Sequence, residues 1–278
     1  MLRSSVLGRL MLVLLVSGFL CTTLCAADKD ANNKREATKA KMKVLTKNAK
    51  TTKLTNKAAA GADEVDLFKA IEDGQIEVGV VQNEMKKGKL FVQNKTDKPL
   101  CVKIPEAFGT RPVLAQMGGA NQQEQLLGNS GVMQQGGGNF MNVPAEKVMA
   151  VQYKSVCLEY GKPEPKNNSV YEIAPIEEVT DKEEVKMICS MLNQVDQRAA
   201  QFAVWHISSG VPMEKLASET VLHANGKRTT NFSKKEAMWG AQLVQFVQGK
   251  VAEKQNPQQM TPEQEDKMFQ NYVPGGSF

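Results

Sequence analysis

The spacing of apolar residues along this chain changes once, between Cys157 and Asp181, and that change constrains the fold more than any other feature. Before Cys157, apolar residues alternate with polar ones in short runs such as Ile76, Val78 and Val80. A period of two is typical of strands with one buried face. From Asp181 onward, apolar residues recur three and four positions apart, which is typical of helices. The sequence therefore predicts an α+β protein whose β part precedes its helical part.

The β part is predicted to span residues 63–178. A short helix is expected first, at residues 65–71. Alternating runs then predict strands at residues 76–80, 90–94, 100–104, 140–143, 147–158 and 170–173. Turn-forming segments separate the runs, so we expect an immunoglobulin-like antiparallel β-sandwich. Residues 117–139 are rich in Gly, Gln and Asn, a composition that predicts a loop within this domain.

A small helical domain is predicted for residues 179–272, followed by a frayed tail at 273–278. Asp181 is expected to cap its first helix, and Asp196 begins a second helix that ends at Gly210. A third helix follows Pro212, and residues 261 onward predict a last short one. Ser233 and Glu236 have the spacing of a capping box, which predicts the start of a fourth helix.

Residues 1–27 have the pattern of a secretory signal peptide. Arg3 and Arg9 precede an apolar run at residues 10–20, and small residues precede Asp28. The run is shorter than the ~20 apolar residues that span a bilayer. We therefore expect a protein that is secreted, periplasmic or at the cell surface, with no transmembrane segment after signal cleavage.

The charges divide the mature chain into two parts. Residues 28–60 hold ten Lys or Arg and three Asp or Glu, so residues 28–62 are predicted to be a disordered, Lys-rich linker. Residues 61–278 hold 23 basic and 27 acidic residues, a balance that gives no reason to expect a nucleic-acid partner. The expected partner is an unknown envelope or surface protein or polymer.

Side chains for catalysis or metal binding are few. Cys101, Cys157 and Cys189 remain after signal cleavage, which leaves open one disulfide with a free thiol or three buried thiols. The two histidines, His206 and His223, lie in no metal-ligand spacing, so we expect no metal and no cofactor. Cys157 and His206 form the one nucleophile–base pairing to consider, that of a cysteine hydrolase.

Two short motifs, at residues 157–163 and 200–205, resemble the Cys and Gln motifs of bacterial thioester domains of the TQXA type. The resemblance implies an internal thioester between Cys157 and Gln201 that amines on a target surface attack. It also implies that Trp205 and His206 support the pair. On the alternative interpretation, Cys157 is a buried strand residue and Gln201 is a polar residue on a core-facing helix.

A wider resemblance covers residues 70–245. Segments 94–100, 105–108, 156–163 and 196–201 are similar to a group of uncharacterised exported proteins of planctomycete-type bacteria. That likeness concerns architecture and implies no activity.

Three hypotheses follow for the function. The first is a secreted, non-catalytic protein that acts by binding or structure at the cell envelope, with an unknown ligand. The second is a thioester adhesin that couples covalently to amines through Cys157 and Gln201. The third is a cysteine hydrolase. Under the first hypothesis, no residue has a catalytic role.

Overall fold

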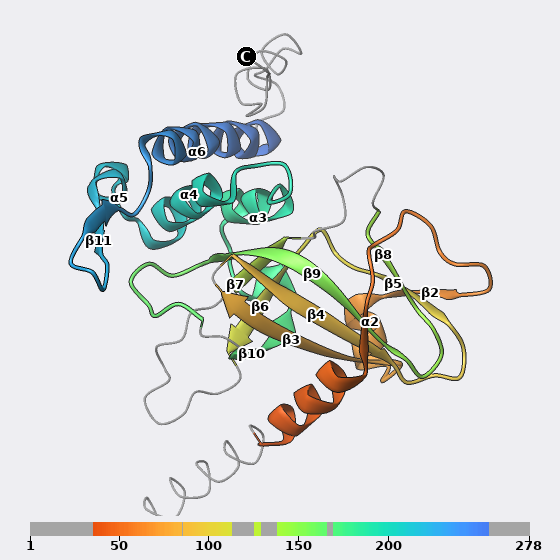
Figure 1. The fold of residues 1–278 in the computed structure, drawn as a ribbon. Helices are drawn as coiled ribbons and strands as arrows, with labels where there is room; N and C mark the ends of the chain where they lie inside the picture. Colours follow the sequence, from red (N-terminus) through yellow and green to blue (C-terminus); the bar gives the residue numbers. More distant parts are fainter. Residues whose placement is uncertain (1–35, 85, 113–124, 129–137, 166–168, 256–278) are drawn as a thin grey trace, which may run out of the picture.

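The structure, a computed structural model, is α+β and describes residues 36–84, 86–112, 125–128, 138–165 and 169–255 (Figure 1). The strands are β1 (Ala49–Thr51), β2 (Asp63–Asp66), β3 (Ile76–Glu84), β4 (Lys87–Asn94), β5 (Leu100–Lys103), β6 (Ala107–Pro112), β7 (Gln125–Gly128), β8 (Phe140–Val143), β9 (Val148–Cys157), β10 (Ser169–Ala174), β11 (Thr220–Leu222) and β12 (Arg228–Thr230). The helices include α2 (Leu67–Glu72), α3 (Glu183–Ser190), α4 (Gln197–Ser209), α5 (Met213–Ser218), α6 (Lys234–Gln255), the 3-10 turn η2 (Ile176–Glu178) and an N-terminal helix at residues 36–48. The predicted signal peptide, the last predicted helix and the tail lie outside the described residues.

The largest sheet curls until it closes. Its strand order is β1-β9-β4-β3-β10-β6-β7, and β7 also pairs with β9. Six strands from β9 to β7 therefore form a ring, here called the closed sheet, while β1 adds to β9 in parallel. A second sheet of order β2-β5-β8 accompanies it.

Strand β7 corrects one prediction, because it lies within residues 117–139, where we expected a loop. It pairs antiparallel with β6 and with β9, in a register that places Gln125 opposite Cys157. A strand of four residues is too short to establish a period of two inside a Gly- and Gln-rich stretch. The rest of that predicted loop, apart from residues 138 and 139, lies outside the described residues.

One apolar core fills the inner face of the closed sheet. Val80, Leu90 and Tyr171 lie in it, each on a different strand of the ring. Val102 and Met141 bring β5 and β8 to the same core. The two sheets and α2 are thus held together by shared burial of apolar surface.

The N-terminal helix corrects a second prediction, the disordered linker at residues 28–62. Met42 and Leu45 of this helix are buried against the outer face of the closed sheet, beside Phe91 and Val148. Gly79 makes the close approach possible, since a Cβ at this position would lie 2.1 Å from the sulfur of Met42.

The linker prediction failed because it used the average composition of the segment, which does not register the positions of its few apolar residues. A few apolar residues at helical spacing are enough to dock a helix, even when lysines surround them. The segment continues as β1, which joins the edge of β9, and Thr55 then forms a bridge with Phe140. Residues 28–35 lie outside the described residues.

Helices α3, α4 and α6 lie over one end of the sheet, opposite the N-terminal helix (Figure 1). They share an apolar cluster with Val156 and Leu158, so the predicted boundary near residue 178 runs through continuous packing. Within the described ranges, no helix is both long and apolar enough to cross a membrane.

The predicted ends of α4 are confirmed, but those of α3 differ. Asp196 accepts hydrogen bonds from the N–H groups of Arg198 and Ala199, and Gly210 ends α4 in the left-handed region at φ +66°. Helix α3 begins one residue later than expected, because its N-cap is Lys182 rather than Asp181, and it has no side-chain cap.

We predict that Leu45→Ala destabilises the protein by about 2 to 3 kcal/mol, because it removes buried methyl groups and leaves a cavity. Val44→Ala is the matched control, since Leu45 is 1% exposed and Val44 is 52% exposed. Urea unfolding of both variants measures the free energy of unfolding. Equal, small effects of the two substitutions would show that this helix does not dock in solution.

Candidate functional site

The two motif residues singled out by sequence meet at the junction of sheet and helices. Cys157 is the last residue of β9, and Gln201 lies in the second turn of α4, 44 residues later. The Cys157 N–H donates to Gln201 Oε1 at 2.8 Å, and Gln201 Nε2 donates to the Cys157 carbonyl at 2.8 Å. Both residues are buried. The carboxamide thus binds the backbone of Cys157 as a neighbouring strand would.

A second glutamine extends this arrangement by one step. Gln197 Nε2 donates to the carbonyl of Ser155 at 2.7 Å, and it also bonds the carbonyl of Lys86. Strand β4 begins at Lys87, and the Ser155 N–H reaches the Lys86 carbonyl at 3.0 Å. Beyond this point β9 continues without β4, and α4 takes the place of that strand.

The spacing of the two glutamines explains why a helix can do this. Residues i and i+2 of a strand lie about 6.7 Å apart along its axis. Residues i and i+4 of a helix are separated by about 6 Å along its axis and lie on one face. Gln197 and Gln201 therefore match the repeat of Ser155 and Cys157. The side chains satisfy backbone groups that would otherwise be buried without partners.

A chain of polar side chains continues from the site into the closed sheet. Tyr153 donates to Gln82 Oε1 at 2.8 Å, and Gln82 Nε2 donates to the Ser155 hydroxyl at 2.5 Å. Tyr153, Ser155 and Cys157 alternate along β9 and so point to the same, inner face. Burial raises the pKa of Tyr153 well above its usual value, so its hydroxyl is a neutral donor.

Tyr171 of β10 lies close to Cys157. Its side chain is 2% exposed, and its hydroxyl has no hydrogen-bond partner among the described residues. Burial raises the pKa of Tyr171 first, and the neighbouring Cys157 raises it further.

The two supporting residues have different positions. Trp205 packs in the same apolar cluster as Cys157, with its ring edge-to-face to Tyr160 at a centroid distance of 5.3 Å. Its Nε1 has no hydrogen-bond partner in the described part of the chain. His206 Nδ1 instead donates to the carbonyl of Val211 at 2.8 Å, which holds the imidazole at the C-terminal end of α4.

A cavity of about 450 Å³ lies beside the end of β9. It is lined by Leu158, Glu159, Ser208, Ser209 and residues 177–182. The Ser208 hydroxyl donates to the Leu158 carbonyl at 2.5 Å, and Glu159 pairs with Lys162 at 2.5 Å. These contacts fix the chain as it leaves Cys157.

Cys101, Cys157 and Cys189 are buried, and they form no disulfide with one another. Burial raises the pKa of Cys101 and of Cys189, which keeps these thiols protonated and unreactive. In the described ranges no three His, Cys, Asp or Glu side chains come together to hold a metal ion.

Sequence reasoning missed Gln197 and Tyr171. Gln197 had a detectable signal, because it stands four residues before Gln201 and so shares its helix face. Tyr171 had none, since only the pairing of β10 with β3 and β6 places it near Cys157.

We predict that Gln201→Ala lowers the free energy of unfolding by about 2 to 4 kcal/mol, because the N–H and carbonyl of Cys157 lose their partners while buried. Gln201→Met keeps most of the volume and should lose nearly as much. Gln245→Ala, on the exposed face of α6, is the control and should change stability little. A Gln201→Met variant as stable as the parent in urea unfolding would show that the two bonds contribute nothing.

Comparison with known proteins gives no relative from which to transfer a role to this site. No protein-family model, no curated protein and no solved structure matches the chain.

Proposed function

We propose that this is a secreted, non-catalytic protein that acts by binding or structure at the cell envelope. One observation carries the non-catalytic part. Gln201 directs both polar atoms of its carboxamide to the backbone of Cys157, in bonds of 2.8 Å that join sheet to helices. Such a paired amide supports the interpretation of Gln201 as a structural joint.

The remaining candidates for chemistry are engaged in the same way. His206 Nδ1 donates to the carbonyl of Val211 at the end of α4, a bond that supports a capping role for this side chain. The sequence of residues 1–27 supports export, and export in turn supports a role at the envelope.

A second candidate, thioester coupling to amines, is favoured by a specific observation. The two motif residues are in contact in a site from which water is excluded. In this chemistry the Cys157 thiol adds to the Gln201 carboxamide carbon, and ammonia leaves as the C–S bond is retained. The Cys157 N–H at Oε1 would stabilise the oxygen charge that develops during this addition.

An immunoglobulin-like antiparallel β-sandwich also stays a proposal for the strands. Two sheets sharing one core support it. The pairing of β7 with β9, which closes the larger sheet, is a departure from an open sandwich.

Intact-mass measurement of the mature protein separates the two candidates. We expect the full mass calculated from residue 28 onward, and three alkylatable cysteines after unfolding, at Cys101, Cys157 and Cys189. Thioester formation would instead lower the mass by one ammonia. That loss would be absent in Cys157→Ala and present in the control Cys189→Ala, and finding it would overturn the non-catalytic proposal.

Envelope binding has its own test. We expect the mature protein to sediment with isolated envelopes of the cells that make it, and to be released by salt, because its expected contacts are partly electrostatic. Heat-unfolded protein is the control for nonspecific adhesion. Recovery of the native protein entirely in the supernatant at low salt would contradict a role in envelope binding.

A further inference from the structure

Strands β11 and β12 form a two-stranded ribbon that extends from the helical layer (Figure 1). All residues from Thr220 to Thr230 are exposed. Val221 is 42% exposed and Leu222 is 58% exposed, and they are two of the most exposed large apolar side chains among the described residues. A ribbon that keeps apolar side chains in water requires an explanation beyond folding.

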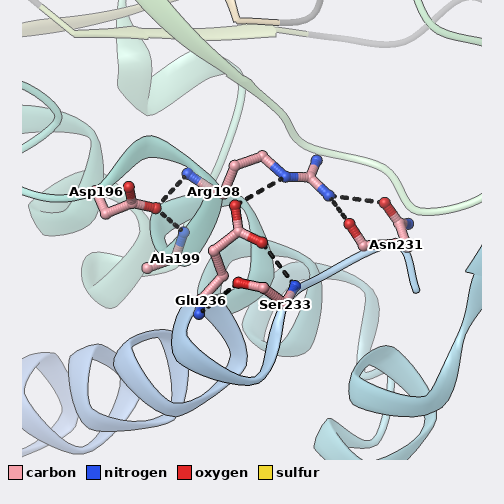
Figure 2. A network of polar contacts seen from close by, with 6 residues as sticks. All are labelled: Asp196, Arg198, Ala199, Asn231, Ser233 and Glu236. Atoms are coloured by element: carbon pink, nitrogen blue, oxygen red, sulfur yellow. Dashed lines mark hydrogen bonds and ion pairs between the residues drawn. The ribbon is translucent and has the colours of Figure 1, made fainter. Parts of the chain in front are cut away.

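The base of this ribbon is held by a network of hydrogen bonds and an ion pair, as Figure 2 shows. Arg198 of α4 donates from Nη2 to the side-chain oxygen of Asn231 at 2.7 Å and to its carbonyl, and Arg198 Nε lies 3.8 Å from Glu236. Glu236 and Ser233 form the predicted capping box of α6, with bonds of 2.7 Å and 3.2 Å. The chain leaving β12 is thus fixed to α4 and α6 together.

The other side of the base is fixed through Glu219. Its carboxylate accepts from the Tyr160 hydroxyl at 2.5 Å and from Asn231 Nδ2 at 2.8 Å. The hydrogen bond to Glu219 raises the pKa of Tyr160 to about 12, so the phenol stays a donor at physiological pH. A fixed base with an exposed end presents the ribbon in one orientation, which reduces the entropy lost on binding.

The backbone of the ribbon has open edges. The Asn231 N–H bonds the Glu219 carbonyl at 2.8 Å, and the His223 N–H bonds the Lys227 carbonyl at 2.9 Å. Antiparallel pairing alternates between bonded and non-bonded residue pairs. Thr220 and Leu222 therefore direct their N–H and C=O groups outward at the β11 edge. Their partners Thr230 and Arg228 direct theirs outward at the β12 edge. Such an edge is a template for an added strand.

The charge around the ribbon is opposite to that of the body. Residues 212–235 contain five basic residues and two acidic ones, whereas residues 61–278 as a whole are more acidic than basic. Lys227 and Arg228 stand on the ribbon itself, and Lys215, Lys234 and Lys235 flank its base. One of the two acidic residues, Glu219, is already bonded to Tyr160 and Asn231.

We propose that the β11–β12 ribbon binds an acidic, extended peptide segment of a partner protein by strand addition. The proposal rests on the binding function proposed above and names its contact element. Open backbone edges favour a peptide over a polysaccharide or a lipid surface, because only a peptide can continue the ladder. Leu222 contacts apolar residues of a strand added at the β11 edge, on the face that Arg228 shares, and the carboxylates of that strand are attracted by the charges of Lys227 and Arg228 on the neighbouring strand.

The same charges disfavour a second copy of this chain as the occupant. Two ribbons paired through their β12 edges would place two strands that each carry Arg228 side by side, and like charges across a strand pair are destabilising. An acidic strand removes this repulsion and gains attraction in its place.

The test uses the mature chain and two labelled probe peptides, one of alternating Glu and Val and one of alternating Glu and Pro, with equal charge. Fluorescence anisotropy measures the dissociation constants at low salt. We expect the Glu–Val peptide to bind, and the Glu–Pro peptide, which cannot pair along its backbone, to bind at least about tenfold more weakly. We also expect Lys227→Glu with Arg228→Glu to weaken Glu–Val binding about tenfold.

The matched control is Lys98→Glu with Lys103→Glu, which makes the same change in net charge at exposed positions away from the ribbon. Equal binding of the two peptides, or an equal loss in the control variant, would overturn strand addition at this ribbon. So would ribbon-dependent dimerisation without peptide binding. Urea midpoints equal to the parent's establish that the ribbon variants fold. Should native protein still sediment with envelopes while both peptides fail to bind, this inference falls and the envelope function stands.

Discussion

Two glutamine side chains on α4 complete a hydrogen-bond ladder where no strand is present, and the joining of sheet to helices depends on them. Without Gln197 and Gln201, the last residues of β9 would bury unpaired backbone groups under Phe202 and Trp205. With them, β9 extends beyond β4 far enough to place Val156 in the helical core. The close approach of α6 to α4 adds to this, since a Cβ on Gly240 would lie 2.6 Å from Phe202.

The parts of the fold that could be predicted are those in which local sequence determines structure. Asp196, Gly210 and the Ser233–Glu236 box act within one turn of chain, and each is found as expected. The alternating strands were recognisable for the same reason. The closure of the sheet could not be predicted, because it depends on β7. This strand has only four residues, and its partners in β6 and β9 lie about 20 and 30 residues away in the sequence. Docking of the N-terminal helix depends on Gly79 of β3, and no local pattern in the helix itself indicates that contact.

The candidate site shows how far a motif can lead. Sequence alone brought Cys157 and Gln201 together as a pair, and they are in contact. It did not give the form of the contact, because that depends on which atoms of Cys157 face α4. The backbone of β9 presents its N–H and carbonyl sideways in the sheet, whereas the side chain points to the inner face beside Tyr171. A glutamine approaching in the plane of the sheet meets the backbone first.

The geometry of α4 links this joint to the ribbon. Successive residues of a helix are rotated by about 100°, so Arg198 faces a different direction from Gln197, its neighbour. Gln197 reaches back to Ser155 while Arg198 reaches Asn231 and lies 4.3 Å from the ring centre of Phe232. One helical turn thus holds the end of β9 on one side and the base of the ribbon on another. Contacts of α4 therefore join the base of the ribbon to the end of β9 through a single helix.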